Sequence, residues 1–159
     1  MITLERGLRH LRWADDAFFA ALQARPAQVL AASATASSWT VGQLARHIVE
    51  GAQWYRYCLT TTPWTDLDLP TDQAGVLALR TELTSVNGVL VTEAAVPDAR
   101  VTFADEHGEA SAWRSTILTQ AMLHSIEHRA QIAVALEVCG FDPIVLDDLD
   151  LWAYERHAD

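Results

Sequence analysis

The sequence predicts an all-α protein built as a four-helix bundle. Apolar residues recur three to four positions apart in four separate segments, which is the spacing of a helix that buries one face. A proline or a glycine follows each of these segments, and the links between them are short to moderate in length. Four helices joined in this way pack naturally as a bundle around a shared core.

The composition predicts a single domain over residues 1–159. Half of the residues are hydrophobic, and the chain contains six Trp, four Phe and three Tyr. A chain of this length buries roughly 68–70% of the surface that its unfolded form exposes, so one core can hold it together. The two cysteines are therefore not needed as a disulfide.

The four helices are expected at about residues 3–23, 40–62, 71–95 and 111–138. A polar, alanine-rich stretch links the first two, and His10 is expected at the surface of the first. The second helix has the clearest start, because Thr40 and Gln43 fit a capping box that satisfies backbone groups at a helix N-terminus. An Asn-Gly pair at 87–88 weakens the middle of the third helix. The sequence pattern predicts a short hairpin at residues 100–113, before the fourth helix, and a short last helix at residues 147–156.

The charge balance argues against two classes of partner. The chain has 11 basic and 21 acidic residues, a formal net charge of -10. Because affinity for nucleic acid comes mainly from cations on phosphate, no nucleic-acid partner is expected. No segment approaches the roughly 18 uncharged apolar residues of a membrane span, and charges interrupt the N-terminal residues where a signal peptide would be apolar. We therefore expect a cytoplasmic protein with no membrane partner, in which Cys58 and Cys139 are buried thiols.

Two histidines one helical turn apart are the most informative chemical feature. His124 and His128 project from the same face of the predicted fourth helix, and two nitrogens at that separation can bind one metal ion. Apolar residues lie on both sides of them along this face, where unpaired imidazoles would be costly. His47 lies beside the apolar stripe of the second helix and completes a three-histidine site if the second and fourth helices face each other.

Two further residues share the side of His47. Glu50 is a candidate general base acting on metal-bound water, a partner that orients an imidazole, or a plain surface carboxylate. Trp54 is expected to form a wall of the pocket. Three protein ligands leave at least one coordination position for water or substrate, which is typical of a reactive site. Imidazole suits Zn, Ni, Fe and Cu alike, so the ligands do not select the metal.

Other catalytic motifs fit less well. Residues 124–128 match the inverzincin pattern H-x-x-E-H with Glu127 as base, but the short sequence that follows leaves little room for a further acidic ligand. A di-iron bundle needs Glu three residues before its histidines, and those positions hold Leu44, Ala121 and Ser125. A G-x-S-x-G nucleophile elbow and a phosphate-binding glycine loop are also missing from the sequence.

Three segments resemble the DinB-like (DNA-damage-inducible) proteins. They are Trp39-Thr-Val-Gly-Gln-Leu-Ala-Arg-His47-Ile, the Asp-Glu-His-Gly turn at 105–108, and His124-Ser-Ile-Glu-His128-Arg-Ala-Gln-Ile132. The resemblance implies an up-down-down-up four-helix bundle, usually dimeric, with a nickel- or zinc-type divalent ion on three histidines, here His47, His124 and His128. Ala130 stands where the family often has glycine, and no ligand is lost.

The resemblance extends the expected function to thiol chemistry. The family includes thiol-dependent S-transferases that use low-molecular-weight thiols, a thiol-dependent isomerase and members of unknown activity. We therefore expect a metal-dependent transferase or hydrolase that acts on a small-molecule substrate in a pocket at one end of the bundle. The ion would be Ni or Zn, with Fe and Mn left open, and any reacting thiol would come from a cofactor or substrate. The alternatives are a bundle that a metal stabilises without catalysis and a metal-free bundle that binds an apolar ligand.

Overall fold

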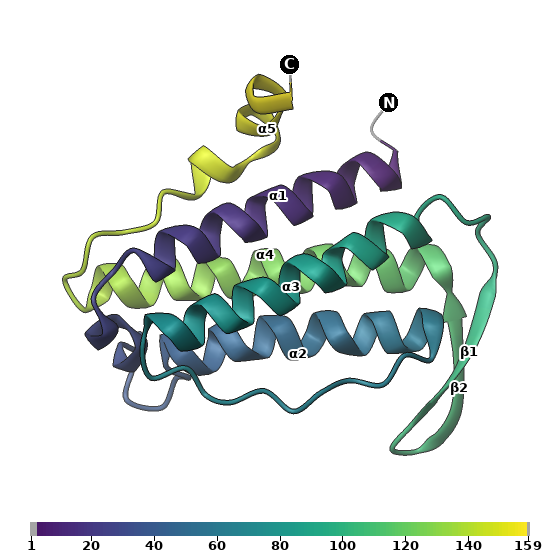
Figure 1. Ribbon diagram of the computed structural model, residues 1–159, viewed down its shortest axis with the longest axis horizontal. Coiled ribbons are helices and arrows are strands. Elements are labelled where there is room, and N and C mark those ends of the chain that lie inside the picture. Colours follow the sequence, from purple (N-terminus) through teal and green to yellow (C-terminus); the bar gives the residue numbers. More distant parts are fainter. Residues whose placement is uncertain (1–2, 159) are drawn as a thin grey trace.

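The computed structural model describes residues 3–158, and these are mostly helical (Figure 1). They form five α-helices and one antiparallel sheet of two strands. The helices are α1 (Leu4–Gln23), α2 (Val41–Thr60), α3 (Gln73–Glu93), α4 (Arg114–Val138) and α5 (Leu151–Ala158), and the strands are β1 (Arg100–Asp105) and β2 (Gly108–Trp113). Two short 3-10 helices are η1 (Ala27–Ala31) and η2 (Leu146–Leu149). The predicted all-α class is confirmed in this broad sense, and the predicted hairpin is the small sheet.

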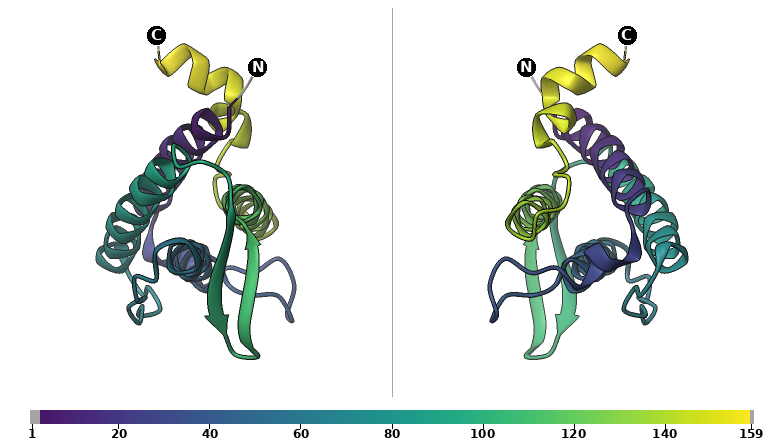
Figure 2. Two further views of the ribbon diagram at one scale, coloured as in Figure 1. Left: turned by 90° about the vertical axis from the view of Figure 1, so that its right-hand side faces the viewer. Right: turned by 90° about the vertical axis from the view of Figure 1, so that its left-hand side faces the viewer.

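The four long helices lie side by side and differ in direction. Figure 1 shows α1 and α4 running one way while α2 and α3 run the other. Seen along the helix axes, α1 packs against α3, and α2 packs against α4 (Figure 2). The long link between α2 and α3 returns along the outside of these helices. The pairing of α2 with α4 brings the two helices that carry the predicted metal ligands together.

Apolar side chains fill the space between the helices in two clusters. The larger cluster includes the fully buried residues Phe18, Phe19, Ile48, Leu83, Ile132 and Leu136. The second cluster, against which the hairpin packs, includes Leu8, Leu11, Leu90 and Leu118. Burial of apolar surface is the main favourable term in folding, so these contacts hold the helices together.

Three local elements differ from the sequence-based expectation. α4 begins at Arg114 because the six residues before it pair with β1. The Asn-Gly pair does not interrupt α3, since the Asn87 side chain is buried and donates a hydrogen bond to Asp15 of α1 at 2.8 Å. The link between α1 and α2, expected to be a polar stretch, contains η1 and buries Val29 and Leu30. In each case a tertiary contact outweighs local propensity.

The C-terminal segment packs against α1. The His10 ring nitrogen Nε2 lies 2.8 Å from the carbonyl oxygen of Leu149, at the end of η2. The rings of Trp13 and Tyr154 lie 5.5 Å apart between centroids and connect α1 to α5. His10, expected at the surface, is therefore partly buried by this segment.

α4 carries apolar residues on its outer face as well as on its inner face. The inner residues Leu118, Ile132 and Leu136 are buried. The outer residues Leu123, Ile126, Val134 and Val138 are between 48% and 63% exposed. The apolar pattern of α4 does not by itself select the face that turns inward. Even so, none of the helices in residues 3–158 is long and apolar enough to cross a membrane.

We predict that the capping box contributes measurably to stability. Thr40 Oγ1 accepts a hydrogen bond from the backbone N–H of Gln43 at 3.2 Å, and Gln43 Oε1 accepts one from the backbone N–H of Thr40 at 2.8 Å. Thr40→Ala should lower the free energy of unfolding by about 1 kcal/mol, measured by urea denaturation, because it removes the cap. Thr40→Ser keeps the hydroxyl and should retain most of the stability; equal losses in the two variants would contradict this role.

Candidate metal centre

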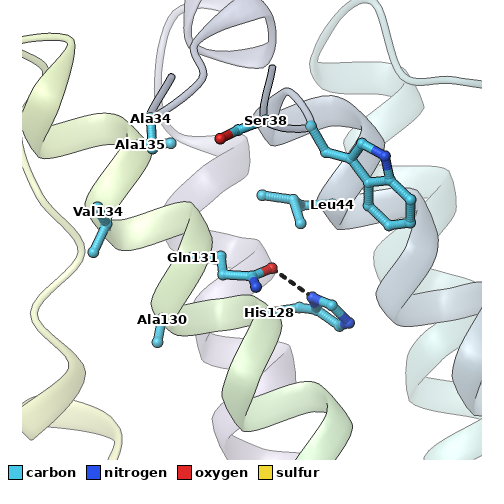
Figure 3. A pocket seen from close by; sticks show the side chains of 9 residues that line it. Ala34, Ser38, Leu44, His128, Ala130, Gln131, Val134 and Ala135 are labelled. Atoms are coloured by element: carbon cyan, nitrogen blue, oxygen red, sulfur yellow. Dashed lines mark hydrogen bonds between the residues drawn. The ribbon is translucent and has the colours of Figure 1, made fainter. Parts of the chain in front are cut away.

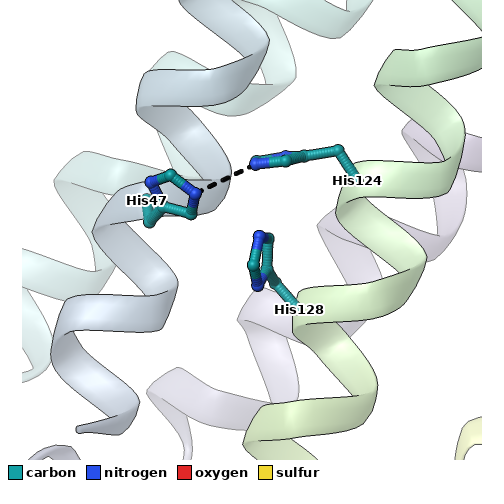
Figure 4. A group of neighbouring side chains, drawn as sticks. All are labelled: His47, His124 and His128. Carbon is teal, nitrogen blue, oxygen red and sulfur yellow. Dashed lines mark hydrogen bonds between the residues drawn. The ribbon is translucent and has the colours of Figure 1, made fainter. Parts of the chain in front are cut away.

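Three histidines from two helices converge on one point between α2 and α4 (Figure 4). His47 comes from α2, and His124 and His128 come from successive turns of α4. One ring nitrogen from each of the three residues lies within 4.8 Å of the others. All three side chains are partly buried. The three histidines singled out in the sequence therefore lie together in space.

The spacing of two of these nitrogens suits a shared cation. The Nε2 atoms of His47 and His124 lie 3.1 Å apart. Two nitrogens bound to one zinc-type ion at about 2.0–2.1 Å, with an angle between 90° and the tetrahedral value, are separated by about 2.9–3.4 Å. The His128 ring packs edge-on against both partners, with centroids 4.7 Å and 4.4 Å away. The donor set present is therefore compatible with a divalent metal ion.

A glycine on α2 makes room for this arrangement. A Cβ atom at Gly51 would lie 2.3 Å from Cε1 of His124, closer than real Cβ contacts allow. Because Gly51 has no side chain, the His124 imidazole lies directly against the backbone of α2 and reaches His47. Gly51 lies one turn after His47, so the same stretch of α2 supplies one ligand and accommodates a second.

Burial keeps two of the imidazoles in the neutral form that binds metal. Burial, together with the positive charges that His128 and His47 would carry, lowers the pKa of His124 to about 4. The pKa of His47 is also lowered, first by burial and then by His128. Since a metal ion binds the neutral ring, these shifts keep both rings available to a metal ion at lower pH than an ordinary histidine would be.

Neighbouring side chains orient two of the rings. The amide oxygen of Gln131 lies 2.7 Å from Nδ1 of His128 and can only accept, so Nδ1 donates and Nε2 keeps its lone pair. One carboxylate oxygen of Glu50 lies 3.9 Å from Nδ1 of His47, and the other lies 3.1 Å from Nε of Arg46. Glu50 thus faces the His47 nitrogen opposite the one that approaches His124. This position suits a partner of His47, whereas its role as a general base stays a prediction.

A cavity of about 550 Å³ opens beside His128 (Figure 3). Its walls come from the link before α2, from the start of α2 and from the second half of α4. The lining residues are Ala34, Ser38, Trp39, Leu44, His128, Ala130, Gln131, Val134 and Ala135. The cavity therefore extends from the histidines toward the end of the helices where α2 begins. Its volume lies within the range of small-molecule sites.

The aromatic wall beside His47 is Trp39, not Trp54. The Trp39 and His47 rings meet edge-on at 4.7 Å. Trp54 packs instead against Tyr57 and Phe103, with centroids 5.6 Å and 5.9 Å away. With Glu50, Trp54 lines a separate cavity of about 460 Å³ under the link between α2 and α3. The structure thus places Glu50 and Trp54 together, but it does not bring Trp54 to the cavity beside His128.

Three residues that shape the site, Trp39, Gln131 and Gly51, have no role that the sequence pattern predicts. Trp39 directly precedes the helix cap, and its contact with His47 depends on how the link folds back. Gln131 follows His128 by three residues, a helical spacing that could have suggested a contact. Gly51 lies in the apolar stripe of α2, but its function depends on the approach of α4. Helical spacing was a usable signal only for Gln131.

The two cysteines differ in exposure. Cys58 is buried, as expected, and burial raises the pKa of its thiol to about 11. It is therefore protonated at neutral pH and a poor nucleophile. Cys139 was also expected to be buried but is exposed just after α4, because the helix ends there and the chain turns away. Neither belongs to the histidine cluster.

Comparison with known families gives a match over nearly the whole sequence. The model of the DinB family matches residues 1–157. The chain belongs to the DinB family. A search of curated proteins finds no match. For this DinB-family protein, family membership and the three-histidine cluster are together compatible with metal binding.

We predict that Gly51→Ala weakens metal binding without a matching loss of stability. The new Cβ would displace the His124 ring, whereas alanine is favoured over glycine in a helix by about 1 kcal/mol. Co²⁺ titration followed by its visible absorption should show at least a tenfold loss of affinity. Gly88→Ala in α3 is the control, because the nearest atom to its Cβ would be 4.0 Å away. Unchanged Co²⁺ affinity in Gly51→Ala would refute the steric argument.

We predict that the metal-free protein loses stability as the pH falls from about 6.5 to about 4. The unfolded chain binds a proton at His124 near its ordinary pKa of about 6.5, whereas the folded chain resists protonation until about pH 4. Urea midpoints measured with chelator present should fall more steeply in the wild type than in His124→Asn. Parallel pH profiles of the two proteins would show that His124 is not the group responsible.

Proposed function

We propose that this DinB-family protein is a metal-dependent enzyme built on an up-down-down-up four-helix bundle. The proposal rests on one observation: three imidazoles from α2 and α4 converge at the edge of a cavity large enough for a small molecule. His47, His124 and His128 would hold the divalent ion. Three ligands leave at least one position for substrate, which distinguishes this donor set from a closed structural site.

The residues around the cavity support binding of a small, largely apolar substrate. Leu44, Val134 and Trp39 offer apolar surface, and several alanines keep the space open. Ser38 and Gln131 are the uncharged polar groups of the lining. Because the lining includes His128, a molecule bound in this cavity would lie next to the metal centre. No Asp, Glu or Arg is among the lining residues, which favours an uncharged substrate group in this part of the site.

The proposed reaction is thiol S-transfer, with hydrolysis as the second candidate. A divalent ion bound at the histidines would supply Lewis-acid chemistry that lowers the pKa of a thiol or of water. The chain's own part is to hold three neutral imidazoles, to orient His128 through Gln131 and to keep an apolar group of the substrate out of water. Since the Cys58 thiol is buried and protonated, and Cys139 lies outside the histidine cluster, the reacting thiol would come from a second molecule.

We also propose that the protein is a homodimer. Leu123, Ile126 and Val138 are exposed on α4 and do not line the cavity, and self-association would shield them from water. Sedimentation of the purified protein at several concentrations tests this directly. A monomer at all concentrations would refute it.

We predict that His124→Ala and His128→Ala abolish binding of one divalent ion per chain. Elemental analysis of tag-free protein measures the ion, and thermal unfolding with and without chelator measures its effect. An ion present at 100 times its dissociation constant should stabilise the wild type by about 2.7 kcal/mol, and this gain should vanish in both variants. His107→Ala is the control, because that side chain is exposed on the hairpin turn. Retention of the ion in both variants would contradict the proposed ligands.

Activity assays separate catalysis from the two alternatives. Metal-loaded protein should transfer a small thiol to an aromatic electrophile, or hydrolyse an activated ester, and chelator should remove the activity. A chelator effect on stability without activity over a broad panel of substrates would favour a structural metal. Wild-type protein that binds no divalent ion would favour a bundle that binds an apolar ligand.

A further inference from the structure

A buried carboxylate joins α1, α3 and α4 on the inner side of the metal centre. Asp15 of α1 is 1% exposed. It accepts a hydrogen bond from Nδ2 of Asn87 at 2.8 Å and another from Oγ of Ser125 at 2.5 Å. Nε of Arg129 forms an ion pair with the same carboxylate at 3.4 Å. All four residues are at most 4% exposed, and we refer to them as the Asp15 network.

The two α4 members of this network directly follow the two α4 histidines in the chain. Ser125 comes after His124, and Arg129 comes after His128. Successive residues of an α-helix are turned by about 100°, so the anchoring pair and the histidine pair occupy adjacent strips of α4. Asp15 therefore contacts both of the helical turns that carry the metal ligands.

The His124 side chain also lies next to the Asp15 network in the interior of the bundle. A small void of about 10 Å³ is lined by Asp15, Asn87, Ser125 and His124, together with apolar residues of all four long helices. The His124 ring thus lies between the Asp15 network on one side and His47 on the other. A rotation of α4 that disturbs the network would also move this ring.

Apolar packing alone leaves the rotation of α4 poorly determined. Leu123, Ile126 and Val134 are exposed, while Leu118 and Ile132 are buried. If α4 turned about its axis, apolar side chains that are now exposed would replace those that are now buried. The same turn would take Ser125 and Arg129 away from the buried Asp15 carboxylate, and loss of these partners is costly.

The network is poorly suited to a role in stability alone. Burial raises the pKa of Asp15 despite the attraction of Arg129 and the two hydrogen bonds. Burial also lowers the pKa of Arg129. Within residues 3–158, Nε of Arg129 has no hydrogen-bond acceptor of suitable geometry. Both charged forms are therefore penalised in the folded protein, and replacing such a group of residues with apolar ones is often neutral or stabilising.

We propose that Asp15 is a positioning residue that, through Ser125 and Arg129, fixes the rotation of α4 so that His124 and His128 face His47. The network acts through the histidines and does not touch the metal. This inference rests on the proposed function only in taking the three histidines as the site of a divalent ion.

An apolar replacement of the whole network separates positioning from stability. We consider the quadruple variant Asp15→Leu/Asn87→Leu/Ser125→Ala/Arg129→Met. Its urea midpoint should equal that of the wild type or be higher. The affinity of this variant for Co²⁺, read from visible absorption, should fall at least tenfold. Wild-type Co²⁺ affinity in this variant, or a loss of stability that accounts for the loss of affinity, would overturn the proposal.

A single substitution keeps the test decisive if the quadruple variant does not fold. Asp15→Asn removes the charge that holds Arg129, and Leu22→Ala is the matched control on α1, because Leu22 is 1% exposed and lies outside the network. Asp15→Asn should lose more Co²⁺ affinity than Leu22→Ala for the same fall in the urea midpoint. If the fall in the urea midpoint accounts for the whole loss of Co²⁺ affinity in both variants, the positioning role of Asp15 is refuted.

A measurement without metal distinguishes failure of this inference from failure of the proposed function. In metal-free wild type, NMR should show contacts between the ring protons of His47 and His124, and these contacts should weaken in Asp15→Asn and not in Leu22→Ala. If the wild type binds no Co²⁺, the proposed function fails and the ring contacts still decide the role of Asp15. Identical ring contacts in Asp15→Asn and wild type would overturn the inference even where metal binds.

Discussion

The candidate site depends on the close approach of α2 and α4 at Gly51. The His124 ring occupies the space that any larger residue at this position would fill. Its Nε2 atom consequently comes within 3.1 Å of Nε2 of His47, a separation that suits two ligands of one ion. Without this contact, His124 and His128 would still share a face of α4, but no third imidazole would meet them.

The three histidines share one centre but have different surroundings. His124 is packed against the backbone of α2, and burial makes its charged form unfavourable. His47 has the Glu50 carboxylate nearby and the Trp39 ring against its edge. His128 is held by Gln131 and borders the cavity. The histidine cluster is thus closed on the side of α2 and open toward the cavity beside His128.

α4 combines an outer face with exposed apolar residues and an inner face with buried polar ones. In a simple amphipathic helix the distribution would be the reverse, and burial of apolar surface would set the orientation. Here the buried ion pair of Asp15 with Arg129 and the hydrogen bond to Ser125 add directional contacts that apolar packing lacks. Directional contacts of this kind can specify one arrangement among several of similar apolar burial.

The sequence by itself determined the helical class, the capping box at Thr40, the hairpin and the identity of the three clustered histidines. These features follow from spacing along the chain, since residues four apart on a helix share a face whatever surrounds them. The partners of those histidines were decided by the tertiary structure. Trp39 rather than Trp54 contacts His47, and Asn87 stabilises a helix that its propensity would weaken. Such contacts join residues distant in the chain, and they depend on which helix faces pack together. Apolar burial and buried polar contacts over the whole core make that choice, and no local pattern does.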